Sequence, residues 1–435
     1  MIRNILTLGF LFFSIMVSAQ TADSLKAERL SVHFQSTVIR QMKPAFHAAY
    51  SGINSLSPRE DAQTSLTSTL FLGLRLWDGA SFYFNPELSG GSGLSGAVGV
   101  ADALNGETYR IGNPAPQISL ARLYVRQLIA LTDKRSYQNS DMNQLGGWIP
   151  ECYVSITIGK SAIADFFDGN KFSHDPRSQF MAWSLMDNGA WDYPANTHGY
   201  TESVMLEYVS PTHELRYAAS LLPKAPNGEE LNWNIGKALS HSLEYTHKHT
   251  IAGQEGAIRL LGYFSTANMG NYRQSLANPS DIASTRVYGH TKYGFGINAE
   301  QNITADLGCF LRAGWNDGHH ETWAFTEIDR TLSGGFVLTG QRWKRSNDNI
   351  GLAYVISGLS KDHRDFLQAG GYGFELGDGT LHYAPEQLAE LYYSAEMKKD
   401  LLYLTAAYQL LVNPGYNKDR SGPVNVFSVR LHVKI

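Results

Sequence analysis

The segment from Asp168 to His198 brings together side chains that suit the recognition of sugars. Trp183, Asp187 and Trp191 lie close together within it, among further tyrosine and asparagine residues. Aromatic rings stack on the C–H face of a pyranose ring, while carboxylates and amides form hydrogen bonds with its hydroxyl groups. Trp and Tyr are also enriched where a protein meets a membrane interface. The sequence leaves both interpretations open for the two tryptophans.

A second set of candidates consists of charged side chains that alternate with apolar residues. Along an extended strand, such side chains share one face and the apolar residues share the other. An arginine fork donates hydrogen bonds to sugar hydroxyls and a facing carboxylate accepts them, so a group of both could select a sugar. Each arginine also has a simpler interpretation, in which it pairs with a neighbouring carboxylate and supports the wall. The candidates are Arg75, Arg122, Arg126, Arg312, Glu327, Asp329 and Arg430.

Two patterns could suggest a cofactor or a metal. Gly91 to Gly96 matches the G-x-G-x-x-G string of dinucleotide-binding sites, but that fingerprint needs a following helix in a βαβ unit. His319 and His320 are adjacent, so they would point to opposite faces of a strand, and no nearby cysteine completes a metal site. We therefore predict neither a cofactor nor a bound metal.

Glu327 and Asp329 could also form the acid and base of a glycosidase. Two carboxylates that are two residues apart on a strand lie on one side of it at about 7 Å, a spacing that inverting enzymes use. Catalytic carboxylates flank the substrate from opposite sides, however, and this arrangement does not provide that. The sequence therefore predicts no catalytic residues and a protein that is not an enzyme.

The C-terminus indicates the kind of element that positions these residues. From Ser428 onward, apolar residues alternate with polar and charged ones. This pattern is typical of a strand whose apolar side meets lipid and whose charged side meets a water-filled lumen. The apolar side would carry Val429, Leu431, Val433 and Ile435, and the polar side Ser428, Arg430, His432 and Lys434. The pattern predicts a strand of a membrane β-barrel.

Similar alternating runs recur along the chain. The clearest are Leu66–Trp77, Ser119–Gln127, Cys152–Ile158, Val204–Tyr208, Leu215–Leu221, Leu239–Tyr245, Ile258–Phe264, Tyr293–Ala299, Leu307–Trp315, Trp323–Asp329, Ile350–Ile356, Leu391–Met397 and Leu402–Leu410. A mature chain of about 416 residues, at roughly 25 residues per strand and connection, accommodates about 16 strands. Barrels of that size leave an aqueous channel, and the long stretches Gly90–Pro116 and Asp168–His198 are expected to narrow it. We therefore predict an all-β fold, a transmembrane antiparallel β-barrel of about 16 strands with a water-filled channel narrowed by long loops.

The N-terminus predicts export from the cytoplasm. Residues 5–17 are almost wholly apolar, follow a basic start at Arg3, and precede small residues at Ser18 and Ala19. This apolar stretch is short for a membrane span, so a signal peptide of residues 1–19 is favoured over an anchor. Residues 20–435 would then form a single outer-membrane barrel domain. The net charge of −4 gives no reason to expect nucleic acid as a partner.

Several motifs resemble one known family, the carbohydrate-selective porins of the OprB type. They are Tyr50–Leu56, Ser173–Tyr193, Gly314–Gly318, Ala324–Arg330 and Asn413–Arg420, the last followed by Gly422-Pro423-Val424. Ser421 interrupts a motif that commonly runs Asp-Arg-Gly-Pro-Val, and the chain ends in Ile435 where an aromatic residue is usual. The resemblance implies a 16-stranded outer-membrane barrel that passes monosaccharides and small oligosaccharides by facilitated diffusion.

The expected function is thus a passive sugar channel of a Gram-negative outer membrane. Its partners would be carbohydrate solutes such as glucose and the lipid of the outer membrane, and a homotrimer is one assembly that the prediction leaves open. One alternative is a non-conducting barrel that binds or anchors surface polysaccharide. Another is a secreted β-rich polysaccharide enzyme, which the terminal strand argues against because it would expose Phe427, Val429 and Leu431 to water.

Overall fold

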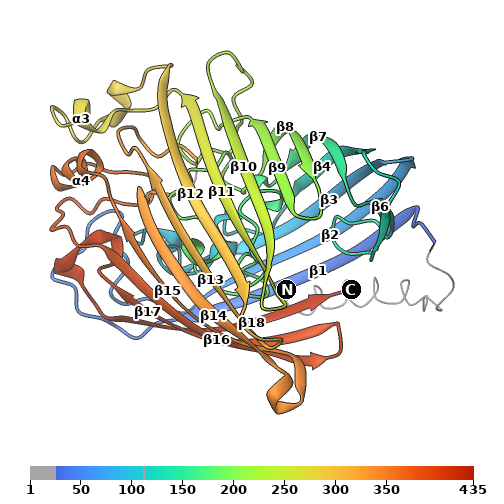
Figure 1. Cartoon of the computed structure of the whole chain (residues 1–435). Helices are drawn as coiled ribbons and strands as arrows, with labels where there is room; N and C mark the ends of the chain where they lie inside the picture. Colours follow the sequence, from blue (N-terminus) through green and yellow to red (C-terminus); the bar gives the residue numbers. More distant parts are fainter. Residues whose placement is uncertain (1–25, 111–112, 325) are drawn as a thin grey trace.

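The computed structural model describes residues 26–110, 113–324 and 326–435, and within these residues sixteen antiparallel strands close into one barrel (Figure 1). The wall consists of β1 (Leu30–Met42), β2 (Gln63–Trp77), β3 (Ala80–Gly91), β4 (Gln117–Ala130), β7 (Tyr153–Ser161), β8 (Thr201–Val209), β9 (His213–Ser220), β10 (Leu239–Ile251), β11 (Gln254–Ala267), β12 (His290–Asn302), β13 (Leu307–Asn316), β14 (Arg330–Gly340), β15 (Arg345–Gly358), β16 (Glu386–Lys398), β17 (Leu402–Val412) and β18 (Val424–Lys434). The predicted fold class is confirmed. The predicted signal peptide, residues 1–19, lies outside the described residues.

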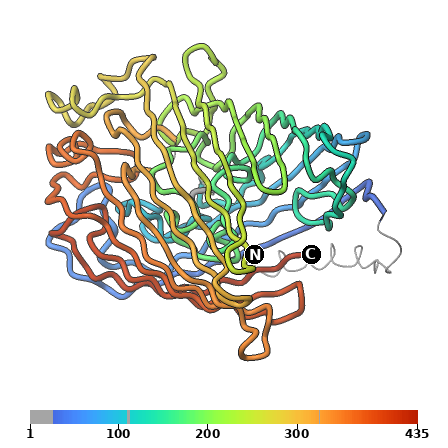
Figure 2. The backbone as a smooth tube through the Cα atoms, in the orientation of Figure 1, coloured from blue at the N-terminus to red at the C-terminus, as the bar shows by residue number. Residues whose placement is uncertain are grey.

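The first and last strands close the wall. β1 pairs with β18 in antiparallel register, with Val38 opposite Leu431, and the blue and red ends of the tube adjoin in Figure 2. Neighbours along the chain pair around the rest of the barrel, and β4 is joined to β7 across the separate β5–β6 hairpin (Arg135–Gln138 and Gly147–Pro150). Closure leaves no free sheet edge in the membrane, where an unpaired backbone group would be costly.

The terminal strand has the two faces that its sequence predicts. Phe427, Val429 and Leu431 are 41% to 53% exposed on the outside of the barrel. Arg430 and His432, on the opposite face, are at most 4% exposed. Successive side chains point to opposite faces of a strand, so the apolar residues meet lipid and the charged residues point into the lumen.

One predicted strand is wrong. Residues 323–329 form part of a loop, and the strand β14 begins after them, at Arg330. The alternation in this segment does not separate two faces, because Trp323, Glu327 and Ile328 are all buried inside the barrel at 2% exposure or less. β14 itself escaped prediction because Gly334 and Gly335 interrupt its apolar rows. Glu327 and Asp329 therefore lie in a loop.

The two ends of the barrel differ. Short turns at 78–79, 210–212, 252–253, 303–306, 341–344 and 399–401 mark one end, together with the longer segment 131–152. The opposite end carries long loops, including those with α3 (Tyr272–Ser275) and α4 (Lys361–Gln368), and Figure 1 shows these helices far from β6. Membrane barrels have short periplasmic turns and longer extracellular loops, so we call the two ends periplasmic and extracellular. No helix in the described residues is long and apolar enough to cross a membrane.

Two extracellular loops fold into the lumen and build the interior. The loop of residues 162–200, called the inserted loop here, contains η3 (Ile163–Asp165) and α2 (Trp183–Met186). The loop of residues 92–116 contains η1 (Leu94–Ala97) and η2 (Gly106–Arg110). Phe180 of the inserted loop packs on wall residues Phe310 and Tyr392, with ring centroids 5.7 and 4.9 Å away. The other short helical turns are η4 (Ile282–Thr285), η5 (Gln341–Trp343), η6 (Pro414–Tyr416) and η7 (Lys418–Arg420).

Candidate channel constriction

A wall carboxylate holds the start of the helical turn in the inserted loop. Glu390 Oε1 accepts a hydrogen bond from Met181 N at 2.7 Å, and its Oε2 accepts one from Ala182 N at 2.9 Å. Gln409 on the neighbouring strand donates to the same Oε2 at 2.9 Å. Buried backbone N–H groups need partners, and Glu390 supplies them from the wall for the two residues that precede α2.

A second carboxylate secures the loop of residues 92–116. Glu386 accepts hydrogen bonds from Ala101 N at 3.0 Å and Asp102 N at 2.8 Å. Asp102 Oδ1 in turn accepts from Ser184 N of the inserted loop at 2.8 Å. Burial raises the pKa of the Asp102 carboxyl well above its usual range. The two loops thus form one packed body that is bonded to β16.

Arg312 on β13 holds the inserted loop from the other side. Its guanidinium donates to Ser173 O at 2.6 Å and to Leu185 O at 2.7 Å, and its Nε lies 3.0 Å from Asp168 Oδ2. The side chain is fully buried. A planar guanidinium presents five donors in a fixed geometry, so one side chain can fix several carbonyl groups of a loop.

Arg430 on β18 holds another part of the inserted loop in the same way. Its Nη1 donates to Pro176 O and Gln179 O, both at 2.7 Å, and its Nη2 donates to Thr405 Oγ1 at 3.1 Å. This side chain is also fully buried. The sequence left two interpretations open for Arg312 and Arg430, contact with a solute or support of the structure, and both side chains donate to carbonyl groups of the inserted loop.

Two wall glycines make room for the loop. Gly296 and Gly314 lie opposite each other on β12 and β13, and Asn188 of the inserted loop packs directly on both. A Cβ atom at either position would overlap the Asn188 side chain. A glycine in a strand often marks a place where another part of the chain comes close. This glycine pair sets how near the inserted loop lies to the wall.

Trp183, Asp187 and Trp191 lie inside this packed body. Each is 1% exposed, and Trp183 stacks on Tyr193 with ring centroids 5.6 Å apart. Burial raises the pKa of the Asp187 carboxyl, and His174, whose Nδ1 lies 3.5 Å from Asp187 Oδ1, opposes that shift. These residues do not form a girdle at the membrane interface. A direct contact with a solute would require the inserted loop to move.

Arg122 on the wall strand β4 also pairs with a residue of the inserted loop. Its Nε and Nη2 form two hydrogen bonds of 2.6 Å with the carboxylate of Asp165, which belongs to the inserted loop. The Arg122 side chain is 4% exposed, whereas that of Asp165 is 28% exposed and reaches the lumen. Bidentate pairs of this kind are strong and directional. Arg122 therefore positions a carboxylate that a solute can reach.

A ladder of alternating charges lines the lumen beside this pair. Arg126 on β4 lies 2.9 Å from Glu207 on β8, and Glu207 lies 3.1 Å from Arg216 on β9. Arg216 continues the ladder to Glu214, at 2.6 Å. The side chains of Arg126 and Arg216 are 25% and 16% exposed. Two partly exposed guanidinium groups, on β4 and β9, thus flank a carboxylate on β8 that is only 4% exposed.

The remaining predicted residues lie at opposite ends of the barrel. Arg75 and Arg126 line one pocket at the periplasmic end. Glu327 and Asp329 lie on the extracellular side, where His363 Nδ1 is 3.0 Å from Asp329 Oδ2. Burial would raise the pKa of Asp329, but the charge and hydrogen bond of His363 hold it at about 2, whereas burial raises the pKa of Glu327 to about 7. Neither carboxylate is more than 1% exposed.

Sequence reasoning missed Asp165, Glu207 and Arg216. Glu207 and Arg216 follow the outward-facing Leu206 and Leu215 and therefore point to the opposite, inner face. The alternation that identified the other arginines would also have identified these two residues. Asp165 lies in a loop, where strand phase gives no signal. Among the residues that the structure describes, no three His, Cys, Asp or Glu side chains gather as a metal ion would require.

Comparison with known proteins decides the family of this barrel. A family model described as the carbohydrate-selective porin, OprB family, matches residues 54–435. The chain belongs to the OprB family of carbohydrate-selective porins. It is an outer-membrane channel protein and not an enzyme, as the sequence predicts.

Solved structures show the same fold. The high-pH structure of Pseudomonas putida OprB is similar at a TM-score of 0.70 and 17% identity, with 94% of each chain covered. The low-pH structure of that protein is similar at a TM-score of 0.50 and 12% identity, covering 94% of this chain and 93% of the other. Comparison with curated protein sequences finds no match. The resemblance that the sequence motifs suggested is confirmed for this OprB-family porin.

Proposed function

We propose that this porin passes monosaccharides such as glucose, and small oligosaccharides, into the periplasm along the ladder of Arg126, Glu207 and Arg216. The observation that carries the proposal is that these guanidinium and carboxylate groups alternate along the lumen wall, with the side chains of Arg126 and Arg216 25% and 16% exposed and that of Glu207 4% exposed. Guanidinium groups donate to sugar hydroxyls and carboxylates accept from them. Several weak contacts suit a channel, because a pore that held its solute tightly would not release it.

The buried residues have a different part in this proposal. Arg312, Arg430 and Glu390 fix the inserted loop, and the loop sets how much of the lumen stays open. Asp165, which Arg122 holds in place, adds one exposed carboxylate beside the ladder. Trp183, Asp187 and Trp191, the other candidates for sugar recognition, would then influence the passage of sugar only through the shape of the loop.

Swelling of proteoliposomes tests this function. Liposomes that contain the mature porin should swell faster in glucose and maltose than in a zwitterionic dipeptide of similar size. The variant Arg216→Gln should reduce the difference between sugar and dipeptide. Equal rates in sugar and dipeptide would contradict a sugar-selective path. No swelling in any solute would favour a non-conducting barrel that binds surface polysaccharide.

Two further parts of the proposal concern the mature molecule. We propose that residues 1–19 are removed, so that N-terminal sequencing of protein from outer membranes should begin at Gln20. A homotrimer is one expected assembly, and light scattering of the detergent-solubilised protein distinguishes it from a monomer by mass. These measurements are independent of the transport assay.

A further inference from the structure

One periplasmic connection is much longer than the other turns and folds into the mouth of the barrel. Residues 131–152 join β4 to β7 and contain the β5–β6 hairpin, in which Tyr137 pairs with Trp148. Leu145 of this segment is 4% exposed, so it lies inside the barrel. Asn85 Nδ2 on the wall donates to Asn143 Oδ1 at 2.7 Å. We call residues 131–152 the periplasmic hairpin.

Glu28, just before β1, and His33, near the start of that strand, also hold this hairpin. Gly146 N donates to Glu28 Oε2 at 2.8 Å, and Glu28 N donates to Gly146 O at 2.8 Å. His33 Nε2 and Ser140 Oγ are 2.9 Å apart. Such reciprocal hydrogen bonds give the hairpin a defined place, since each buried backbone group finds a partner. The hairpin is therefore a built part of the periplasmic mouth.

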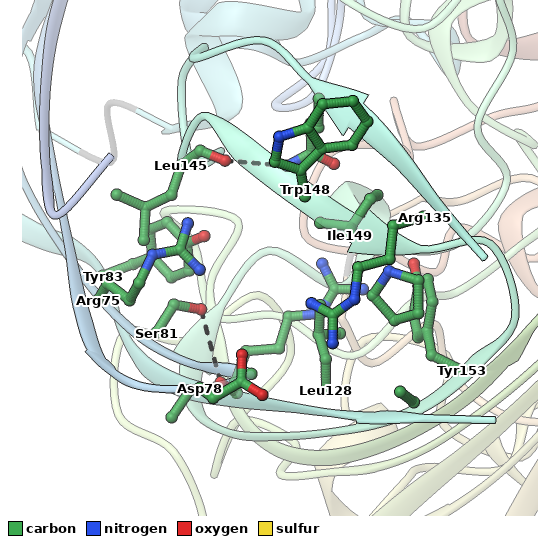
Figure 3. Close-up of a pocket in the computed structure, with 16 residues that line it drawn as sticks. Arg75, Asp78, Ser81, Tyr83, Leu128, Arg135, Leu145, Trp148, Ile149 and Tyr153 are labelled. Carbon is green, nitrogen blue, oxygen red and sulfur yellow. Dashed lines mark hydrogen bonds between the residues drawn. The ribbon is translucent and has the colours of Figure 1, made fainter. Parts of the chain in front are cut away.

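A pocket lies between the hairpin and the wall (Figure 3). The space that it encloses, with the adjoining open solvent included, is about 720 Å³. Arg75 and Arg135 lie on either side of it in Figure 3, with Trp148 above them and Asp78 and Tyr153 below. The wall strands and the hairpin thus contribute to one cavity that neither would form alone.

The pocket combines an aromatic surface with excess positive charge. Three arginines and one aspartate line it. Arg126 is already paired with Glu207, but Arg75 donates to the carbonyl groups of Glu28 and Gly146, at 2.9 and 3.1 Å, and these bonds leave its charge uncompensated. Within the described part of the chain, the side chain of the exposed Arg135 forms no hydrogen bond or ion pair.

Trp148 supplies the aromatic surface. It is 45% exposed and packs against Tyr137 edge to face, at a centroid distance of 5.5 Å and an interplanar angle of 75°. It lies on a hairpin whose two-stranded sheet is separate from the barrel wall. An indole ring in this setting can stack on the C–H face of a sugar while guanidinium groups bind an anionic substituent of the same molecule.

We propose that the periplasmic hairpin forms a second saccharide subsite, which takes anionic sugars that carry a carboxylate or a phosphate. This subsite deepens the proposed sugar-transport function and rests on it. Arg135 and Arg75 bind the negative group, and Trp148 stacks on the ring. A solute leaving the charged ladder would meet this subsite at the periplasmic exit.

Saturation-transfer NMR on the full mature porin in detergent micelles measures such weak binding directly. Sodium glucuronate and glucose 6-phosphate serve as the anionic probes and separate the carboxylate from the phosphate. Glucose serves as the neutral probe, and inorganic phosphate as an anion without a sugar ring. We expect at least one anionic sugar to bind more tightly than glucose and than inorganic phosphate, with an affinity that falls as salt is added.

Two variants locate the subsite. Arg135→Gln should weaken binding of the anionic sugar about tenfold, because it removes a charge-assisted hydrogen bond, and should leave glucose unchanged. Trp148→Ala should weaken both sugars. Arg273→Gln on extracellular α3 and Trp233→Ala, whose ring is 70% exposed on an extracellular loop, are matched controls that should change neither.

The failure of this subsite and the failure of the transport function give different results. If the liposomes swell in sugar but Arg135→Gln does not change the binding of the anionic sugar, the subsite is overturned and the transport function stands. Absence of preference for the anionic sugars over glucose would overturn it too. Loss of binding in Arg135→Gln without any swelling by the wild-type porin would overturn the transport function instead.

Discussion

Arg312 on the barrel wall and Asp168 on the inserted loop form an ion pair of 3.0 Å in which both side chains are at most 1% exposed. The same guanidinium binds carbonyl groups of Ser173 and Leu185. One wall residue therefore fixes the loop near its start, near its middle and at its helical turn. An isolated buried charge is costly, so both members of this pair depend on each other.

Arg312→Met should loosen the inserted loop. Removing one partner of a buried pair leaves an uncompensated carboxylate and costs on the order of 3–5 kcal/mol. We expect a lower urea midpoint of unfolding in micelles and larger, noisier single-channel currents. Arg342→Met is the matched control, because Arg342 lies in a periplasmic turn with 61% of its side chain exposed. Unchanged current and midpoint in Arg312→Met would contradict the role of this residue as a support.

Gly314→Ala tests the close contact between the loop and the wall. A Cβ atom at this position overlaps Asn188, so the loop must shift away from β13. We expect altered conductance in Gly314→Ala and recovery of the wild-type value in the double variant Gly314→Ala with Asn188→Ala. Gly262→Ala on β11 is the control, since its Cβ would meet open space. A normal current in Gly314→Ala would show that the glycine pair does not set the position of the loop.

Arg216→Gln tests the charged ladder. This change removes a positive charge from the lumen surface and takes from Glu214 one of its two cationic partners, while Lys248 remains. We expect the reversal potential in a salt gradient to shift toward cation selectivity and the block of current by glucose to weaken. Arg345→Gln, at the periplasmic rim with 48% of its side chain exposed, should have little effect on either quantity. Equal effects of the two variants would argue against a specific ladder.

The raised pKa of Glu327 predicts that the stability of the protein depends on pH. Burial raises its pKa from 4.5 to about 7, so between these values the folded protein keeps a proton that the unfolded chain loses. The free energy of unfolding contributed by this group therefore falls as pH rises through that window. Glu327→Gln cannot ionise, so its urea midpoint should rise relative to the wild type from pH 4.5 to 7 and then stay level.

The control for this measurement is Glu229→Gln, whose parent side chain is 78% exposed on an extracellular loop. Its midpoint should follow the wild type at every pH. Parallel curves for Glu327→Gln and the wild type would mean that Glu327 does not retain its proton in the folded state.

The fold was predictable because its strands obey one simple rule. Apolar residues such as Leu431 must face lipid and their neighbours must not, and this leaves a period-two signal in the sequence. The rule failed at Trp323, where apolar and polar residues are buried alike inside the lumen, and at Gly334, where glycine interrupts the apolar row.

The roles within the lumen were less predictable. Strand phase shows that Arg312 and Arg430 point inward, but it does not show what fills the lumen in front of them. Their partners are carbonyl groups of a loop far away in sequence, and any residue type can supply such a carbonyl. Trp183 carries an ambiguous signal for the same reason, since a buried indole and a sugar-binding indole have the same residue type.

The central claim is that this barrel is a channel with a saccharide site. Its most direct test is the single-channel current of the refolded mature protein in a planar bilayer, measured before and after glucose and then maltose are added. We predict a stable current that each sugar blocks in part, at concentrations in the millimolar range, with different strength. A stable current that neither sugar reduces, or a folded barrel that carries no current, would contradict the claim.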